Sequence, residues 1–163
     1  LLNDIQIGVH EGAELILDGR SRSVPNKGYF LGPCLFDHVQ AHMQIYQKEL
    51  FGPILVMLRV NTFDEALNLL NQHRYGNGGV IFTRSGGYAQ QFSERAECGM
   101  IGVNIPIPVP MVAHPFGGWK QSSFGDRPMH ALESIHFYSQ QKTVTTTWPQ
   151  QDENLISFNM PNH

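Results

Sequence analysis

The stretch from Pro53 to Asn104 constrains the fold most, because it alternates short apolar runs with amphipathic segments. The apolar runs, which are typical of buried strands, are PILVMLRV (53–60), VIFT (80–83) and MIGVN (100–104). The first run is nearly unbroken, which predicts a strand buried on both faces. Two strand-helix units in succession predict a parallel sheet with right-handed crossovers. The sequence therefore predicts an α/β fold with a parallel βαβαβ core.

Both helical segments of this stretch carry start signals. Thr62 and Glu65 form a capping box, in which each side chain satisfies a free backbone N–H at the helix start. Ser85 is expected to cap the second helix in a similar way. The glycines of YGNGG (75–79) and Gly99 are expected to end the two helices, since glycine tolerates left-handed backbone.

The flanking segments predict smaller elements. Before the core these are a helix tail over 1–9, a strand over 13–17, an extended segment over 29–36 and a short helix or turn over 41–48. Pro33 places the extended segment near a sheet edge, because proline cannot donate to a ladder. After the core, residues 129–138 predict one or two helical turns with Leu132, Ile135 and Tyr138 facing inward.

The segment KTVTTTW (142–148) is rich in β-branched residues and predicts a strand late in the chain. An unpaired strand edge recruits another chain, so we expect a homo-oligomer, specifically a dimer, held through this segment. The polar remainder over 150–163 is expected to form a flexible tail.

A proline-rich stretch, VNIPIPVPMVAHPFGGWK (103–120), follows the third predicted strand. Ligands in open α/β sheets bind outside the carboxyl ends of the strands. Prolines also reduce the conformational freedom that such a loop loses on folding. Gly117 and Gly118 either let another backbone segment approach closely or adopt positive φ. From the residues alone, the wall of a binding site and a surface loop over the sheet edge are equally supported.

The composition limits the partners. A chain of 163 residues with 41% hydrophobic residues suits one domain with its own core. The net charge of -3 argues against a nucleic-acid partner, and no run of 18 apolar residues predicts a membrane span. Two cysteines without a disulfide framework favour a cytoplasmic protein. The chain begins Leu-Leu-Asn-Asp without Met, which favours a piece of a longer protein.

The sequence contains no nucleophile elbow, zinc-protease motif or standard phosphate loop. His38 and His42 are spaced i, i+4 without an evident third ligand, so we predict no metal site. Cys34 and Cys98 are predicted to be packing residues, because nothing near either would stabilise a thiolate. Glu49, just before the first apolar run, is either a solvated surface carboxylate or an acceptor for sugar hydroxyls.

Five motifs together resemble the C-terminal part of aldehyde dehydrogenases. In order they are KELFGPIL, YGNGGVIFTR, GMIGVNIPIPVPM, PFGGWKQSSFGD and FYSQQKTVTTTW. The resemblance covers nearly all of residues 1–150, and VNIPIPVP is most similar to the CoA-acylating methylmalonate-semialdehyde dehydrogenase branch. It implies the C-terminal half of a catalytic domain over 1–137, an oligomerisation strand over 138–149 and the tail over 150–163.

The resemblance also implies site residues. Glu49 matches a glutamate that binds the nicotinamide ribose of NAD, and Phe51 an aromatic that packs on the nicotinamide side. Phe116 matches an aromatic of the substrate tunnel, and the loop from Asn104 to Pro115 matches the tunnel wall. These two loop ends are therefore candidate substrate-binding residues together with Phe116.

The chemistry implied by the resemblance is oxidation of methylmalonate or malonate semialdehyde to propionyl-CoA or acetyl-CoA, with coenzyme A as co-substrate. The nucleophilic cysteine of that reaction lies upstream of the matching motifs. The chain alone is therefore expected to be inactive, with no catalytic residue of its own. The alternatives are a non-catalytic oligomerisation fragment, or a general NAD-dependent aldehyde dehydrogenase that releases free acid.

Overall fold

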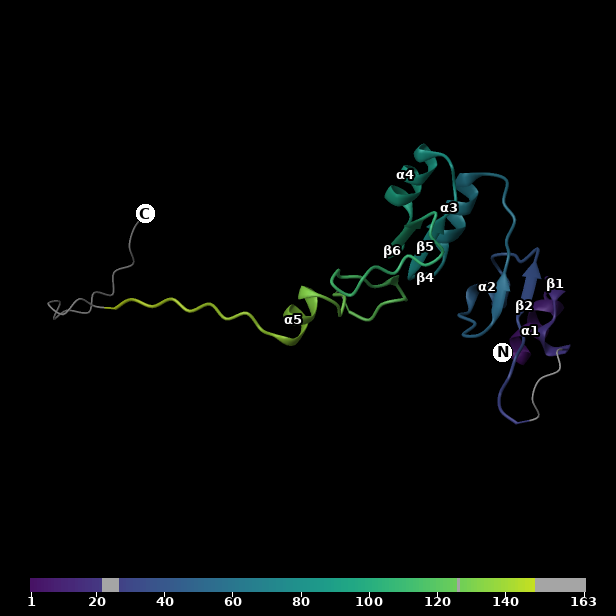
Figure 1. The fold of residues 1–163 in the computed structure, drawn as a ribbon, viewed down its shortest axis with the longest axis horizontal. Coiled ribbons are helices and arrows are strands. Elements are labelled where there is room, and N and C mark those ends of the chain that lie inside the picture. The colour runs from purple at the N-terminus through teal and green to yellow at the C-terminus, as the bar shows by residue number, and fades with distance from the viewer. Residues whose placement is uncertain (22–26, 126, 149–163) are drawn as a thin grey trace.

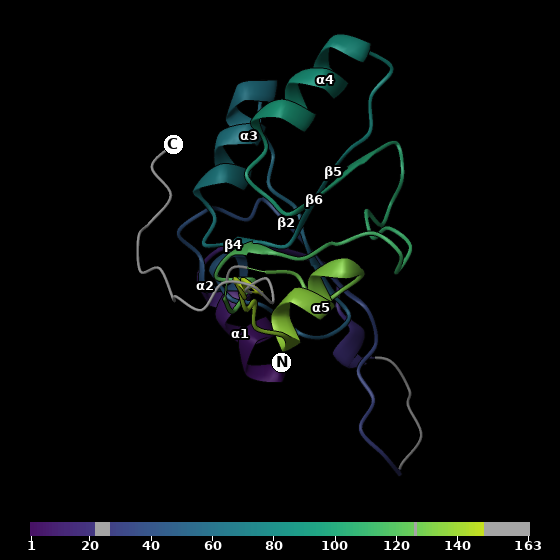
Figure 2. The same cartoon turned by 90° about the vertical axis from the view of Figure 1, so that its left-hand side faces the viewer.

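The computed structural model describes residues 1–21, 27–125 and 127–148 (Figures 1 and 2). Its helices are α1 (Leu2–His10), α2 (Gln44–Gln47), α3 (Phe63–Gln72), α4 (Gly86–Arg95) and α5 (Leu132–Tyr138), with a 3-10 turn over Gly19–Ser21. Its strands are β1 (Glu14–Leu17), β2 (Cys34–Asp37), β3 (Ile54–Val56), β4 (Tyr75–Gly76), β5 (Gly78–Ile81), β6 (Met100–Val103) and β7 (Trp119–Lys120). Every helix in these ranges is too short or too polar to cross a membrane.

β2 forms the centre of a three-stranded sheet, with β1 antiparallel on one side and β3 parallel on the other. Phe36 lies opposite Leu15 in one ladder and Val56 in the other. The prediction that Pro33 marks an edge strand is wrong. Pro33 only precedes the ladder: the Gly32 N–H before it donates to the Gly19 carbonyl at 3.3 Å, and the Cys34 N–H after it donates to the Pro53 carbonyl at 2.8 Å.

The α/β class is confirmed, but the predicted parallel core is divided. β5 and β6 form a parallel pair joined by α4, as expected. β3 instead pairs with β2, and it is an edge strand of its sheet. Leu55 is 62% exposed, so the run over 53–60 is not buried on both faces. An apolar run does not specify its ladder partner, and β2 provides that partner here.

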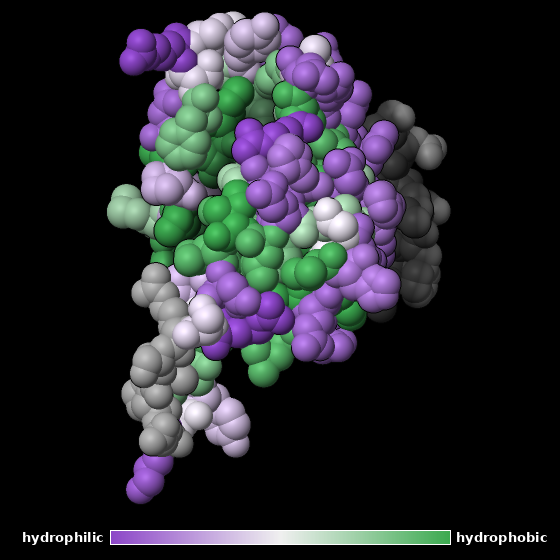
Figure 3. Space-filling model, turned by 90° about the vertical axis from the view of Figure 1, so that its right-hand side faces the viewer, coloured by the Kyte–Doolittle hydropathy of each residue, from purple (hydrophilic) through white to green (hydrophobic). Residues whose placement is uncertain are grey.

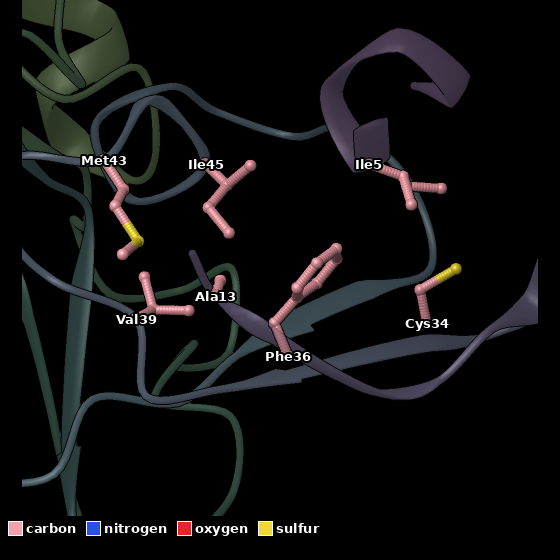
Figure 4. Close-up of a cluster of buried hydrophobic side chains, with 7 residues drawn as sticks. All are labelled: Ile5, Ala13, Cys34, Phe36, Val39, Met43 and Ile45. Carbon is pink, nitrogen blue, oxygen red and sulfur yellow. The ribbon is translucent and has the colours of Figure 1, made fainter. Parts of the chain in front are cut away.

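The first core lies between α1, α2 and the three-stranded sheet (Figure 4). Its buried members are Ile5, Ala13, Cys34, Phe36, Val39, Met43 and Ile45. Phe36 and Ile5 are fully buried, and each such side chain contributes roughly 1.5–3 kcal/mol. A Cβ on Gly8 would lie 2.8 Å from Cδ1 of Ile45, so α1 packs directly against α2.

The second core lies beneath α3 and α4, which run side by side in both ribbon views. Its buried members are Leu67, Phe92, Ala96 and Cys98. Rings from the two helices also meet, because Phe63 and Tyr88 have centroids 5.1 Å apart. This core fixes the α4–β6 connection, and therefore the point at which the proline-rich loop leaves the sheet.

The predicted helix starts are confirmed. Thr62 Oγ1 accepts the Glu65 N–H at 3.2 Å, and Ser85 Oγ accepts the Tyr88 N–H at 3.3 Å. The Glu65 carboxylate bonds the N–H of Asn61 at 2.8 Å, one residue before the cap, so the capping box is shifted by one position.

The predicted helix ends are wrong. α3 and α4 end at residues 72 and 95, and the following His73 and Ala96 have extended backbone. None of the glycines in 75–79, nor Gly99, has positive φ. Tyr75 and Gly76 instead pair with Lys120 and Trp119 across the antiparallel β4–β7 ladder. These glycines provide room for neighbouring segments rather than left-handed caps.

The C-terminal predictions fail in part. Leu132, Ile135 and Tyr138 of α5 are 72%, 61% and 81% exposed, so they do not face inward. Residues 142–148 form no assigned strand, since no segment within the described ranges pairs with them. Figure 1 shows this segment extending away from the body beyond α5. The predicted tail over 150–163 lies outside the described residues, and the boundaries at 137 and 149 stay predictions.

Hydrophobic side chains are also exposed on the part that carries α1 and the three-stranded sheet. Leu2 and Ile16 are 60% and 51% exposed. Leu55, on the edge strand β3, is also mostly exposed. Figure 3 shows hydrophobic surface bordered by polar residues on the side of the molecule that holds these elements. This sheet is therefore not fully covered by the described chain.

Candidate functional site

Glu49 follows α2 and precedes β3, in a segment without regular structure. Its carboxylate is exposed and opens onto a hollow of about 440 Å³. We call this the Glu49 hollow; it is lined by Lys48, Glu49, His73, Tyr75, Asn77, Gln121, Ser122 and Phe124. An exposed carboxylate at the rim of such a hollow can accept hydrogen bonds from hydroxyl groups of a ligand.

Phe116 lies near the end of the proline-rich loop and is half-buried. Its ring stacks on that of His130, with centroids 4.2 Å apart and planes 8° from parallel. It lines two hollows, of about 410 Å³ and about 380 Å³. We call them the Phe116–His130 hollow and the Phe116–Lys120 hollow, after the residues that line each with Phe116. Pro115 lines the second of them.

The Glu49 hollow adjoins the Phe116–His130 hollow. Both are lined by the same three residues, Asn77, Ser122 and Phe124. Residues 67 positions apart in the chain, Glu49 and Phe116, are thereby brought to neighbouring hollows. Of the predicted cofactor and substrate residues, Glu49 and Phe116 thus line adjoining hollows.

Phe51 lies outside these hollows. Its side chain is 89% exposed and lines none of the hollows described above. It precedes Gly52, whose backbone N–H donates to the Leu50 carbonyl at 2.7 Å in a tight turn before β3. The turn therefore presents the aromatic ring to solvent, two residues beyond Glu49.

Asn104 has a structural role that sequence reasoning did not identify. Its amide oxygen accepts the Thr83 N–H at 2.8 Å, and its amide nitrogen donates to the Thr83 carbonyl at 3.0 Å. Its own N–H donates to the Ile81 carbonyl at 2.8 Å, and its φ is 56°. The side chain thus continues the β5–β6 ladder and fixes the start of the loop. The structure does not bring it into either Phe116 hollow.

The far end of the loop is held by close backbone packing. A Cβ on Gly99 would lie 1.8 Å from the Gly117 carbonyl oxygen. Gly117 and Gly118 do not have positive φ, so close approach is the alternative that the structure supports. The Gly76 N–H also donates to Ser122 Oγ at 3.1 Å, which ties β4 to the turn after β7.

Lys120 is a second residue that sequence reasoning missed. Its ammonium donates to the carbonyls of Asn71 and His73, the latter at 3.3 Å, and pairs with Glu97 at 3.1 Å. Carbonyls at a helix C-terminus carry partial negative charge and favour such a cation. The PFGGWK motif contains this lysine, but nothing local in it indicates these distant partners.

His73 joins the segments around the Glu49 hollow. The Tyr75 N–H donates to its Nδ1 at 3.1 Å, so Nε2 carries the proton that reaches the Tyr46 carbonyl at 2.9 Å. Tyr46 in turn donates its hydroxyl to the Leu69 carbonyl at 2.9 Å. These contacts connect α2 to the end of α3 and so help to place Glu49 beside the hollow.

The two cysteines are packing residues, as predicted. Cys34 is 2% and Cys98 4% exposed, each within one of the two cores. Burial raises the pKa of the Cys98 thiol, and the Lys120 ammonium opposes this only in part. Such a thiol is a poor nucleophile. Among the described residues, no group of three or more His, Cys, Asp or Glu side chains could hold a metal ion.

Comparison of the sequence with known proteins identifies the family that it matches. Residues 1–144 match the family model described as "Aldehyde dehydrogenase family". The chain is 49% identical over 149 residues to a malonate-semialdehyde dehydrogenase of Pseudomonas aeruginosa, and 45% identical over 148 residues to malonate-semialdehyde dehydrogenase 2 of Oceanobacillus iheyensis. These alignments cover 90% of this chain and 30% of each relative. The chain thus spans about 30% of the length of the curated relatives that it matches.

Solved structures agree with these sequences. A Sinorhizobium meliloti protein, assigned as a methylmalonate-semialdehyde dehydrogenase and complexed with NAD, is 47% identical with a TM-score of 0.87. The methylmalonate-semialdehyde dehydrogenase of Oceanimonas doudoroffii is 45% identical with a TM-score of 0.86. Both matches cover 91% of this chain and 31% of the other chain.

Proposed function

Because this chain belongs to the aldehyde dehydrogenase family, we propose that it forms one wall of a site for NAD-dependent aldehyde oxidation. Glu49 and Phe51 face the cofactor, and Phe116 faces the aldehyde, with the loop from Asn104 to Pro115 beside it. The observation that carries this proposal is the junction of the Glu49 hollow and the Phe116–His130 hollow. A cofactor and a substrate that react must meet at such a junction.

Each residue has a chemical role in the proposal. The exposed Glu49 carboxylate accepts hydrogen bonds from ribose hydroxyls. The exposed Phe51 ring packs on the nicotinamide side, and Phe116 packs against the aldehyde chain. Asn104 fixes the loop through Thr83 and need not contact the substrate. When bound, NAD supplies the hydride acceptor.

We propose methylmalonate or malonate semialdehyde as the substrate, because the similar proteins carry these names. The proline-rich stretch over 103–110 favours the branch that transfers the acyl group to coenzyme A, giving propionyl-CoA or acetyl-CoA. Product analysis distinguishes this from a general aldehyde dehydrogenase, which would release the free acid. We propose a cytoplasmic location, because both cysteines are free thiols, as is usual in a reducing compartment.

The attacking cysteine is not among the residues proposed for this wall. Cys34 and Cys98 are both buried, so neither can reach an aldehyde in the hollows. We therefore expect no NADH formation when the 163-residue chain is mixed with malonate semialdehyde, NAD and coenzyme A. Turnover by this chain alone would contradict the proposal that neither Cys34 nor Cys98 attacks the aldehyde.

A chimera tests the proposed wall directly. Residues 1–144 replace the matching segment of the Pseudomonas aeruginosa relative, which supplies the remainder of an enzyme. We expect NADH formation from malonate semialdehyde, with the KM for NAD raised about tenfold by Glu49→Gln or Phe51→Ala, since one ligand contact is lost in each. Glu94→Gln, on the exposed face of α4, is the matched control and should leave this KM unchanged. A folded chimera in which Glu49→Gln has no effect on NAD would overturn the role of Glu49.

A second candidate function is a non-catalytic oligomerisation module. The observation that favours it is the exposure of Val144 and Trp148, at 74% and 85%, in the segment beyond α5. Large apolar side chains in an extended segment suit pairing with a second copy of the chain. Light scattering should then show a dimer that removal of residues 139–163 converts to a monomer. A dimer without any change in melting temperature on addition of NAD would favour this function over the first.

A further inference from the structure

Arg127 lines both the Phe116–His130 hollow and the Phe116–Lys120 hollow. Its side chain is 49% exposed, so the guanidinium is accessible from solvent. Among the described residues that line these two hollows, none is acidic. The described lining around Phe116 therefore carries basic side chains and no carboxylate, and the carboxylates that lie beside Lys120 and Arg127, those of Glu97 and Glu133, are outside it.

The other basic side chains that line these hollows, Lys120 and His130, already contact other groups of the protein. The Lys120 ammonium is held by Glu97 and by the carbonyls at the end of α3. The His130 ring lies flat on Phe116. Among the described residues, the carboxylate beside Arg127 is that of Glu133, and the 3.9 Å from Arg127 Nη1 to Glu133 Oε2 is longer than a hydrogen bond. Its planar guanidinium can thus donate two parallel hydrogen bonds to an anion such as a carboxylate.

The order of residues along the hollows suggests the polarity of the substrate. Glu49 opens onto one hollow, the shared residues Asn77, Ser122 and Phe124 follow, and Phe116 with Arg127 lines the next. A semialdehyde has a reacting aldehyde at one end and a carboxylate at the other. With the aldehyde toward the Glu49 side, the carboxylate lies toward Arg127.

We propose that Arg127 determines specificity by binding the carboxylate of the semialdehyde, so that the site selects acidic aldehydes over neutral ones. The inference rests on the proposed function, since it assumes that the Phe116 hollows receive the aldehyde. Guanidinium groups match carboxylates in a planar pair of hydrogen bonds, which lysine cannot reproduce. Arg127 contacts the non-reacting end and takes no part in hydride transfer.

Titration of the ¹⁵N-labelled 163-residue chain tests this. The probes are 3-hydroxypropanoate and 1,3-propanediol, which have equal chain length and differ in one carboxylate, and amide shifts of residues 115–130 are followed at constant ionic strength. We expect 3-hydroxypropanoate to bind at least about tenfold more tightly than the diol. Arg127→Gln should remove this preference, Arg127→Lys should retain part of it, and Glu133→Gln should strengthen it by removing the competing carboxylate.

Arg84→Gln is the matched control, because it removes the same charge from the loop before α4 and lines neither hollow. Equal affinity for both probes, or unchanged anion affinity in Arg127→Gln, would overturn the inference. NAD is titrated into the same samples to separate the two proposals. NAD-dependent shifts near Glu49 without anion selectivity would leave the proposed function standing and reject only the role of Arg127. Anion selectivity lost in Arg127→Gln supports that role whether or not NAD binds.

Discussion

The backbone at Gly99 lies so close to Gly117 that a Cβ at position 99 would stand 1.8 Å from the Gly117 carbonyl oxygen. Gly99 begins the approach to β6, and Gly117 ends the proline-rich loop that leaves β6. The loop therefore returns to the base of the strand from which it starts. Phe116 is held beside this contact, so the geometry of both Phe116 hollows depends on it.

Gly99→Ala should destabilise the fold by about 2–3 kcal/mol, because the neighbouring atom is backbone and cannot rotate away. Gly86→Ala, at the start of α4, is the matched control, since no atom lies within 4 Å of the added Cβ. That change should be neutral or stabilise by up to about 1 kcal/mol, through helix propensity. Urea unfolding followed by circular dichroism measures both, and equal effects would contradict the close packing.

Asn104→Ala should lower the free energy of unfolding by about 2 kcal/mol, because both hydrogen bonds to Thr83 are lost and alanine is strained at a φ of 56°. Asn104→Gly loses the same bonds but tolerates this φ, so it separates the two causes. Denaturant unfolding of the three proteins gives both differences. A substrate role alone, without a structural one, predicts no loss of stability in either variant.

Stability should fall at acidic pH through Asp37. Hydrogen bonds from the Arg59 guanidinium, more than that from the His38 N–H, hold the pKa of the Asp37 carboxyl below its ordinary value of 3.8. Because the folded-state pKa is lowered, the contribution is complete above that value. It is lost as the pH falls below 3.8 through the lowered pKa. Unfolding measured from pH 6 to pH 2 should show a shallower decline for Asp37→Asn than for the wild type, and identical slopes would count against the pair.

Neither cysteine should react with a thiol reagent in the folded chain at pH 8. Cys34 and Cys98 are buried, and the pKa of Cys98 is raised by that burial. Both should react in denaturant, giving two thiols per chain by Ellman's reagent. Rapid modification of either one before unfolding would show an accessible thiol and reopen the question of a nucleophile within this chain.

The elements that the sequence predicts well are those set by nearby residues. The starts of α3 and α4 follow from hydroxyls at Thr62 and Ser85 that reach an N–H three residues later. Strand partners do not follow in this way. β3 and β5 both belong to short apolar runs that predict strands, yet each pairs with a different strand, and only the complete chain decides which edge is available.

The candidate site could likewise be predicted only in part. Resemblance to a known family selected Glu49 and Phe116, which the structure brings to adjoining hollows. The parts played by His73 and Asn104 could not be predicted, because they depend on carbonyls and N–H groups of residues distant in the sequence. The exposure of α5 was also missed, since an amphipathic pattern does not say whether a partner surface is present.

The three contacts of the Lys120 ammonium have a practical consequence for redesign. One side chain, on the short strand β7, contacts the end of α3 and the segment that follows α4 at Glu97. Libraries that reshape the aldehyde side of the hollows can vary neighbouring positions while this lysine is kept. Arginine there would be a poor replacement, because a planar group cannot direct three donors to targets in different planes.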